Sequence, residues 1–314
     1  LFALFDFKVS YDTELFDYKK ILNGKSHFKS KELYYGNTLY GMDKVLKRYA
    51  HYNKPLNCCI EHGVYFGNYV SESEAVDSGL NGLLTFGNHR MKQLKGIADV
   101  DVVPIGPYIY YAQPLLSKEE IIEWKKNNGK TLLVFPMHSI DRVDVEFDSK
   151  RFIDKIHSIV KEKNIDTVMV CIFYQDIING KDKEYLKHGF KVVCCGYRCD
   201  PVFLRRLKTF ILLSDYTMSN EVGTHLGYCV LYNKPHFLYR QSSKFIPNIK
   251  ADMENIQSET RDSRVEDYRD VETVFDCLTD KVTEEQKKKV EWYWGTNYLR
   301  SRTEMQEIFE GFER

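Results

Sequence analysis

Short, uninterrupted apolar runs alternate with longer mixed segments along most of the chain. The runs that we interpret as strands span residues 56–60, 82–86, 100–106, 131–136, 167–173, 191–196 and 235–239, and another short strand is expected to end near Asp215. These runs lack the inside–outside alternation of a half-exposed strand. They therefore predict parallel sheets whose two faces are both covered by helices.

Helical patterns lie between the apolar runs. Ser117 followed by Glu120 predicts a capped helix start, and Gly129 predicts the end of that helix. Other helices are expected over 42–52, 151–164 and 182–189, within 201–213, from about residue 223, and over much of 284–314. The alternation of strand and helix occurs twice, and the proline-containing segment 107–117 separates the two halves.

We therefore expect an α/β fold in which two Rossmann-like domains face each other across a cleft. The first domain is expected to span 1–114 and the second 115–290, with a C-terminal helix at 291–314 that packs back on the first domain. The highly charged region 250–290 is expected to form surface loop and helix.

Composition narrows the function classes. The chain has 314 residues, of which 43% are apolar and 14% aromatic, and this is enough to fill a folded core. Its 45 basic and 45 acidic residues cancel, so broad electrostatic capture of nucleic acid is not expected. The N-terminal residues are interrupted by charge too soon for a signal peptide, and no apolar run approaches the ~18 residues of a membrane span. A cytoplasmic location is therefore expected.

The cysteine and aspartate patterns give no indication of a metal site. The eight cysteines include no CxxC pair, so zinc is not expected. The adjacent cysteines at 58–59 and 194–195 lie in apolar runs and are interpreted as buried strand thiols, which suits a reducing cytoplasm. The one DxD motif, formed by Asp99 and Asp101, lies in a strand-like run, and we interpret it as a strand edge. No metal or other cofactor is expected.

The segment 212–239 contains the most informative polar turn. Ser219 and Asn220 are expected in a turn after a strand, and Gly223 and Thr224 are expected to open a helix. A helix N-terminus has unpaired N–H groups and a partial positive charge, so it can bind a phosphate. The alternative is that these side chains only cap the helix. The position of this turn, after a predicted parallel strand, favours phosphate binding, because open α/β sheets bind ligands at the carboxyl ends of their strands.

The sequence SDYTMSNEVGTHLGYCVLYNKP in this segment resembles the donor-binding segment of GT-B glycosyltransferases, especially those that build bacterial surface polysaccharides, sialyl- and Kdo-transferase relatives included. In organisation the resemblance covers 50–240, and as a specific motif it covers 215–235. It implies an acceptor-side first domain and a second domain that binds a nucleotide sugar. It also implies that the donor phosphate is bound by Ser219, Asn220, Gly223 and Thr224, with His225 nearby.

A second candidate for donor binding is the segment VFPMHSID at 134–141. Sialyltransferase-like relatives carry a His-Pro pair and a Ser-rich pair at comparable places, whereas here Pro136 precedes His138 and Ser139. His138 could bind a donor phosphate or stabilise charge on the departing nucleotide. The alternative is a histidine that caps a loop.

Glu61 and His62 directly follow a predicted buried strand. A carboxylate there, facing an interdomain cleft, could act as the general base that takes a proton from an acceptor hydroxyl, and we expect Glu61 in this role. His62 is the rival base or an acceptor contact, and one of the two neighbours is expected to be structural. The aromatic side chains of Tyr65, Phe66 and Tyr69 could stack on a sugar ring, but a core position is favoured.

Four further residues could reach the cleft, but surface positions are favoured for them: His89, Arg90, Tyr108 and Tyr110. The whole pattern favours an inverting, metal-independent GT-B glycosyltransferase of bacterial capsule or lipopolysaccharide assembly. On the resemblance alone, the expected donor is a CMP-linked acidic sugar, which is a substrate and not a cofactor. The expected acceptor is a glycan or glycolipid, and peripheral association with the inner membrane or an assembly complex is compatible with this interpretation.

Two alternatives remain open. A non-hydrolysing sugar-nucleotide 2-epimerase shares the two-domain architecture, but it would need several acidic and basic side chains around one sugar. A non-catalytic nucleotide-sugar-binding module would need no general base.

Overall fold

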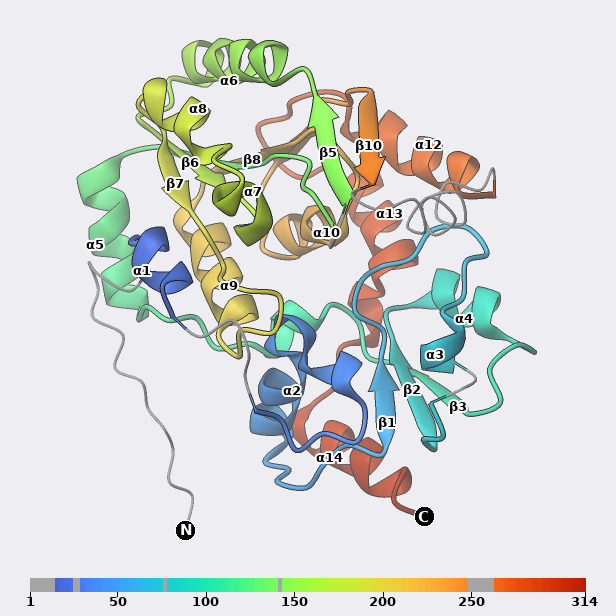
Figure 1. Ribbon diagram of the computed structural model, residues 1–314. Coiled ribbons are helices and arrows are strands. Elements are labelled where there is room, and N and C mark those ends of the chain that lie inside the picture. The colour runs from blue at the N-terminus through green and yellow to red at the C-terminus, as the bar shows by residue number, and fades with distance from the viewer. Residues whose placement is uncertain (1–14, 25–28, 76–77, 141–142, 248–262) are drawn as a thin grey trace.

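Two parallel sheets form the framework of the chain. The computed structural model describes residues 15–24, 29–75, 78–140, 143–247 and 263–314 (Figure 1). Each sheet is the centre of a Rossmann-like domain, and the domain with the larger sheet lies above the other in Figure 1. The expected fold class is confirmed: two such domains meet at a shared pocket, which is the GT-B arrangement.

The sheet of the first domain is small. Its three strands are β1 (Cys58–Ile60), β2 (Gly82–Thr85) and β3 (Asp101–Pro104), all parallel and in the order β1-β2-β3. The helix α2 (Met42–Ala50) packs on the face that Cys58 and Ile60 present. Short helices α3 (Glu72–Ala75) and α4 (Asn88–Leu94) lie on the face of Cys59 and Leu83. The small core of this domain is thus covered on both sides.

The sheet of the second domain has five parallel strands in the order β7-β6-β4-β8-β9. The strands are β4 (Thr131–Phe135), β6 (Thr167–Cys171), β7 (Lys191–Val193), β8 (Tyr216–Ser219) and β9 (His236–Leu238). The chain starts in the middle with β4, adds β6 and β7 on one side, and then returns to add β8 and β9 on the other. The order therefore reverses between β4 and β8, and such a switch point opens a crevice at the carboxyl ends of the strands.

Helices cover both faces of this larger sheet, as the sequence predicts. Leu132 and Val134 face a core formed with α6 (Ser149–Lys163) and α8 (Asp182–Lys187). Leu133 and Phe135 face the opposite core. That core is formed with α5 (Lys118–Asn128), α9 (Phe203–Leu213) and α10 (Thr224–Leu231). All four of these strand residues are buried, which explains the uninterrupted apolar run.

Several predicted boundaries are confirmed and one is wrong. Ser117 and Glu120 form a reciprocal capping box at the start of α5, which ends at Gly129. The strand expected to end near Asp215 instead begins at the next residue, because the apolar segment before it continues α9 to Leu213. Ser219 therefore closes a strand and does not lie in the turn.

Some elements were not predicted. An antiparallel ribbon pairs β5 (Val143–Phe147) with β10 (Ser243–Pro247). Other short elements that were not predicted include η1 (Tyr35–Gly41), η2 (Tyr108–Tyr111) and α7 (Tyr174–Ile178). The helix η2 lies in the expected linker. Of the charged region 250–290, residues 250–262 lie outside the described residues, and α12 (Ser263–Phe275) follows them.

The N-terminal helix α1 (Tyr18–Leu22) lies against the second domain, although its residues fall in the range expected for the first. The hydroxyl of Tyr18 donates to Asp182 at 2.8 Å, and the hydroxyl of Tyr197 donates to the carbonyl of Leu22 at 2.7 Å. Tyr18 belongs to the core on the α6 side of the larger sheet.

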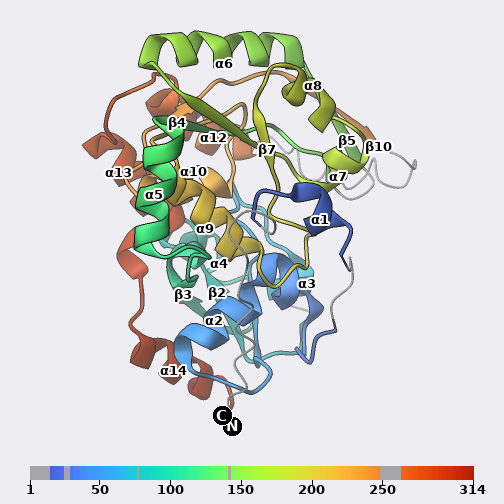
Figure 2. The ribbon, with the colours of Figure 1, turned by 90° about the vertical axis from the view of Figure 1, so that its left-hand side faces the viewer.

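The C-terminal segment runs back along the molecule to the first domain (Figure 2). It comprises α13 (Glu284–Trp294), η3 (Thr296–Tyr298) and α14 (Arg302–Gly311). The helix α13 packs on α10 and α4, and α14 packs on α2. The side-chain amides of Asn57 and Asn81 donate to the carbonyl of Phe312 at 2.9 and 2.8 Å, which ties the end of the chain to the first domain.

Candidate functional site

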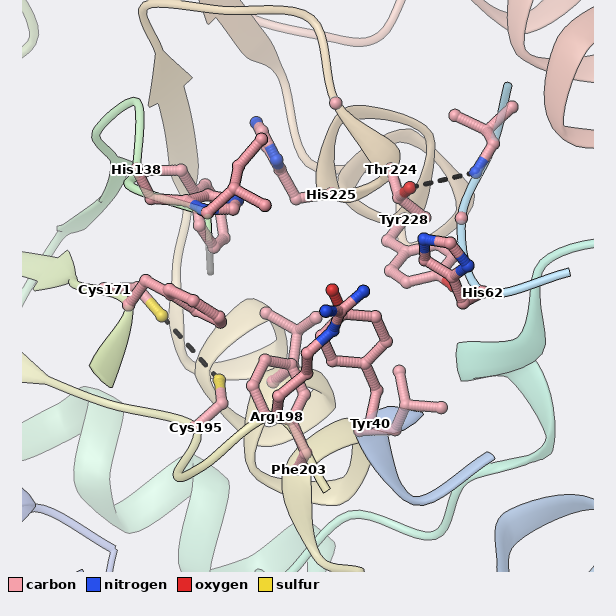
Figure 3. Close-up of a pocket in the computed structure, with 18 of the residues that line it drawn as sticks. Tyr40, His62, His138, Cys171, Cys195, Arg198, Phe203, Thr224, His225 and Tyr228 are labelled. Atoms are coloured by element: carbon pink, nitrogen blue, oxygen red, sulfur yellow. Dashed lines mark hydrogen bonds between the residues drawn. The ribbon is translucent and has the colours of Figure 1, made fainter. Parts of the chain in front are cut away.

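A pocket of about 380 Å³ lies between the two domains at the carboxyl ends of both sheets (Figure 3). Its lining from the first domain includes Tyr40, His62, Gly63, Val64, Tyr65 and Tyr69, and its lining from the second includes Phe135, His138, Cys171, Arg198, Glu221, Gly223, Thr224, His225 and Tyr228. The residues that follow β4 and β8 both reach the pocket, so it occupies the switch point of the larger sheet.

The N-terminus of α10 opens into this pocket. Gly223 is the N-cap residue with extended backbone, and Thr224 begins the helix. The N–H of Leu226 donates to the Gly223 carbonyl at 3.0 Å, whereas the N–H groups of Thr224 and His225 have no partners within the helix, so this end presents donors and a partial positive charge. The Thr224 side-chain oxygen accepts the backbone N–H of Val64 at 3.1 Å, and its carbonyl accepts the indole N–H of Trp294 at 3.0 Å. The site is thus fixed to both domains.

His225 is a half-buried, neutral histidine at this end of α10, and its Nε2 atom is buried. Its ring stacks on Phe135 with a centroid distance of 4.7 Å. Burial, with a smaller contribution from His138, lowers the pKa of His225 to about 3. The Nε2 atom has no hydrogen-bond partner among the described residues. A neutral imidazole at this position can donate or accept one hydrogen bond to a ligand.

His138 and Glu221 line the same wall. The ring of His138 lies 4.6 Å from that of Phe173, and its Nδ1 is 2.9 Å from the carbonyl oxygen of Ser139. That contact favours a proton on Nδ1 and leaves Nε2 as an acceptor. Burial raises the pKa of the Glu221 carboxyl, although the charge and the backbone N–H of His138 partly oppose the shift. Glu221 is the one acidic side chain among the described lining residues.

Three residues of the predicted donor site do not line the pocket. The Ser219 hydroxyl donates to the carbonyl of Glu221 at 2.7 Å, and the Asn220 side chain accepts the N–H of Met137 at 2.6 Å. The Ser139 hydroxyl donates to Asp176 at 2.7 Å. All three are fully buried. They hold the loops after β4 and β8, and the structure brings Gly223, Thr224, His225 and His138 together at the pocket.

Glu61 does not have the position that a general base requires, so this prediction needs correction. Its side chain is 2% exposed and forms an ion pair with Arg90 at 2.5 Å. A second Arg90 nitrogen lies at 3.2 Å, and the Thr85 hydroxyl donates to the same carboxylate. Glu61 is absent from the pocket lining. A carboxylate enclosed by these partners cannot reach an acceptor hydroxyl.

His62, the rival candidate, does line the pocket, and its side chain is 31% exposed. Its Nδ1 lies 2.9 Å from Oε1 of Glu74, which is buried, and 2.9 Å from the hydroxyl of Tyr65. A carboxylate at Nδ1 favours a proton there and leaves Nε2, which also lies 3.3 Å from the Tyr65 hydroxyl, as a base. Glu61 and His62, which follow β1, therefore point in different directions, and His62 is the one that lines the pocket.

Other predicted residues also differ from expectation. His89 and Arg90 are buried, not at the surface, and Tyr108 is buried as well, whereas Tyr110 is exposed. Among the three aromatic residues after β1, Phe66 is buried in the core, and Tyr65 and Tyr69 line the pocket.

Arg198 was missed by the sequence analysis. It is the one arginine or lysine among the described lining residues, and Figure 3 shows it beside Tyr40 and Phe203. Tyr40 and Tyr228 add aromatic surface to the same part of the pocket. A polar residue shortly after the apolar run 191–196 is the signal that could have identified Arg198, because the carboxyl ends of neighbouring parallel strands share one edge.

A metal-ion cluster and a membrane-spanning helix are both absent from the described residues. In the described ranges, no three His, Cys, Asp or Glu side chains are close enough together to hold a metal ion. Asp99 and Asp101 lie at the amino end of β3 and are exposed, on the edge opposite the pocket. None of the described helices has both the length and the apolar character needed to cross a bilayer.

Comparisons with known proteins give weak similarities in structure only. No protein-family model matches the chain, and no curated protein matches it in sequence. UDP-GlcNAc 2-epimerase from Methanocaldococcus jannaschii is 13% identical over 76% of this chain and 63% of its own, with a TM-score of 0.37. MnaA of S. aureus, in a co-structure with UDP, is 11% identical over 71% and 62%, with a TM-score of 0.34.

The pneumococcal O-GlcNAc transferase GtfA, in complex with UDP and GlcNAc, is 9% identical over 86% of this chain and 51% of its own, with a TM-score of 0.33. The chain thus spans less than two thirds of each of these three proteins. Because the TM-scores are low, the similarity identifies neither a family nor a substrate for this chain.

Proposed function

We propose that the chain is an inverting, metal-independent glycosyltransferase that binds a nucleotide sugar in the interdomain pocket and transfers the sugar to a glycan acceptor. In this proposal the second domain binds the donor and the first domain faces the acceptor. The donor phosphate lies at the N-terminus of α10, and His62 is the general base.

One observation carries the proposal: the N-terminus of α10 opens into the pocket at the switch point between β4 and β8. Open α/β sheets bind ligands in this crevice, and a helix N-terminus there favours an anion. Thr224 adds a hydroxyl hydrogen that can be donated, because its oxygen already accepts the Val64 N–H. In a nucleotide sugar the phosphate is bonded to the reactive anomeric carbon, so one pocket can hold the phosphate and the reacting centre together.

The other lining groups suit a sugar nucleotide. Arg198 supplies a positive charge that can pair with a second phosphate or with a sugar carboxylate. The rings of Tyr40, Tyr65 and Tyr228 give flat apolar surface with polar edges, which suits the base and sugar faces of such a ligand.

The chemistry assigned to His62 follows from its pairing with Glu74. Nε2 takes the proton of an acceptor hydroxyl while that oxygen attacks the anomeric carbon from the first-domain side. The bond from the anomeric carbon to the phosphate oxygen breaks, and the nucleotide leaves with the electron pair. The N–H groups and positive end of α10 stabilise the charge that develops on the phosphate. A single direct displacement inverts the configuration of the sugar.

The finer assignments rest on the resemblance of the segment 215–235 to donor-binding segments of polysaccharide-building enzymes. We extend the proposal to a CMP-linked acidic sugar as donor, a glycan or glycolipid as acceptor, and action in the cytoplasm at bacterial capsule or lipopolysaccharide assembly. Arg198 is the side chain that a sugar carboxylate would pair with.

The test is a thermal-shift screen with CMP, UDP, GDP and ADP, followed by assays of the corresponding nucleotide sugars with and without glycan acceptors. A nucleotide at a hundred times its dissociation constant should stabilise the fold by ~2.7 kcal/mol. We expect nucleotide release that depends on the acceptor. Formation of a new nucleotide sugar without acceptor would instead indicate the epimerase. No shift with any of the four nucleotides would contradict the proposal.

A further inference from the structure

Two cysteine thiols meet in the wall of the pocket and have no role in the proposed transfer. Cys171 is the last residue of β6, and Cys195 lies two residues beyond the end of β7. Their Sγ atoms are 3.7 Å apart, and both residues line the pocket (Figure 3). Neither is in a disulfide.

The two sulfur atoms are at contact distance. In the parallel pairing of β6 with β7, Cys171 is opposite Val193, so Cys195 lies two residues past the paired region. Formation of an S–S bond of ~2.05 Å would bring the two sulfur atoms together by about 1.7 Å. The adjacent Cys194 has a different partner, since its Sγ accepts the N–H of Gly196 at 3.3 Å.

We propose that Cys171 and Cys195 are a reversible oxidation site: they form a disulfide by exchange with a small disulfide compound, and the oxidised pocket binds its ligand more weakly. The thiolate of Cys171 attacks one sulfur of the compound, and one small thiol leaves. Cys195 then loses its proton and attacks Sγ of Cys171, and the second small thiol leaves. The two protein thiols lose two hydrogen atoms in total, and the compound is reduced to two thiols.

The order of attack follows from exposure. Cys171 is partly exposed to the pocket, whereas Cys195 is buried. Burial raises the pKa of the Cys195 thiol well above its ordinary value, so its thiolate is scarce and it is the slower nucleophile. A compound that enters the pocket therefore meets Cys171 first, and Cys195 resolves the mixed disulfide from within contact distance.

The expected effect on ligand binding follows from the pocket residues that come directly after Cys195 in the chain. Gly196 and Arg198 line the pocket within three residues of Cys195, and a new bond at Cys195 shifts the start of this segment toward β6. Arg198 would move relative to the end of α10. This second part depends on the proposed function, because it assumes that the pocket binds an anionic nucleotide; the formation of the disulfide does not depend on it.

The experiment uses the full chain with Cys277→Ser, which removes the exposed thiol. The protein is treated with cystamine, remaining thiols are alkylated, and peptides are mapped by mass spectrometry before and after dithiothreitol. We expect a reducible link between Cys171 and Cys195, its loss in Cys171→Ser and in Cys195→Ser, and its retention in Cys194→Ser. A cystamine adduct that stays on Cys171, or a link to Cys194, would overturn the proposed pairing.

Binding is then measured with the nucleotide that gives the largest thermal shift. Oxidation should raise its dissociation constant severalfold, dithiothreitol should restore it, and bound nucleotide should slow the oxidation. An unchanged dissociation constant in the fully oxidised protein would overturn the effect on binding. If no nucleotide binds the reduced protein, the proposed function fails, whereas peptide mapping still decides whether the disulfide forms.

Discussion

The side-chain oxygen of Thr224 accepts a hydrogen bond from the backbone N–H of Val64, at 3.1 Å, across the junction of the two domains. Val64 follows β1 of the first domain, and Thr224 is the first residue of α10 in the second. The bond occupies an acceptor lone pair and leaves the hydroxyl hydrogen for a ligand. One side chain therefore links the first domain to the proposed phosphate site.

Thr224→Val should weaken nucleotide binding by roughly fivefold, which corresponds to the ~1 kcal/mol of one hydrogen bond. Thr224→Ser keeps the hydroxyl and should bind nearly as well as the natural protein. Isothermal titration with the nucleotide found in the screen measures both. Equal affinity of the valine and serine variants would show that the hydroxyl does not contact the ligand.

His62→Gln should lower kcat by roughly 10²- to 10⁴-fold, because it removes the proposed general base. The affinity for nucleotide should not change, since the base faces the acceptor. Glu74→Gln should give a smaller loss of kcat, because the imidazole remains but its Nδ1 loses the carboxylate that orients it. Steady-state kinetics and titration separate the two effects; a loss of nucleotide affinity in His62→Gln would assign this residue to donor binding.

Glu61→Gln should destabilise the fold by about 3 kcal/mol, because it leaves the buried guanidinium of Arg90 without its counter-charge. At temperatures well below unfolding, kcat should change little. The matched control is Glu123→Gln, which makes the same chemical change at an exposed position and should alter stability by less than ~0.5 kcal/mol. Denaturant unfolding gives both values, and normal stability with lost turnover would return the base role to Glu61.

The stability of the fold should fall as the pH falls from about 6.5, and His225 should contribute to this. The His225 imidazole has a pKa lowered from 6.5 to about 3 in the fold, whereas in the unfolded chain it takes up a proton near pH 6.5. Between these values the unfolded state binds more protons, so the unfolding free energy decreases with decreasing pH, by up to ~1.4 kcal/mol per pH unit for this one group.

The measurement is urea unfolding between pH 4.5 and 7.5. His225→Gln should have a shallower pH dependence than the natural protein, whatever its absolute stability. His157→Gln changes an exposed histidine on α6 and should keep the natural slope. Parallel curves for the natural protein and His225→Gln would mean that the pKa of this imidazole is the same in the fold as in the unfolded chain.

Gly295→Ala should destabilise the fold by at least ~2 kcal/mol. Gly295 has φ +69°, and a Cβ there would lie 2.2 Å from the carbonyl oxygen of Phe86. Gly96→Ala is the matched control, because Gly96 has a similar φ of +77° with no atom within 4 Å of the added Cβ. Thermal unfolding should therefore show a larger loss at 295 than at 96. Equal losses would mean that α13 can move away from the first domain at little cost.

Much of the fold could be predicted from local patterns. Most strands of the two sheets are short apolar runs buried on two faces, and this pattern is visible in single segments such as 131–136. The start of α10 at Gly223 was predicted because a glycine after a polar turn, followed by an apolar periodic segment, is a local signal. The ribbon of β5 and β10 was not predicted, because its strands are about a hundred residues apart in the chain and are partly exposed.

The site was predicted less well than the fold, and the pair after β1 explains why. The sequence identifies Glu61 and His62 as polar groups at the end of a strand, but adjacent side chains there point to opposite sides. Which of the two side chains reaches the pocket depends on Arg90, which is 29 positions away in the chain and neutralises Glu61. Similarly, Ser219 and Asn220 are satisfied by distant partners such as His236 and Gln241. Such long-range pairing has no signal in a single sequence.

The return of the chain to the first domain restricts how the two domains can move. Besides the passage from α1 to η1, the chain passes between the domains at 112–117 and at 295–301. The N–H of Arg300 donates to the hydroxyl of Tyr111 at 3.0 Å, so these last two crossings are neighbours. Two bodies joined at neighbouring points can rotate about an axis near those points, but they cannot slide apart. A relative motion of the domains that widens the pocket would therefore swing about these crossings, and it would lengthen the Thr224–Val64 contact while the Tyr111–Arg300 contact persists.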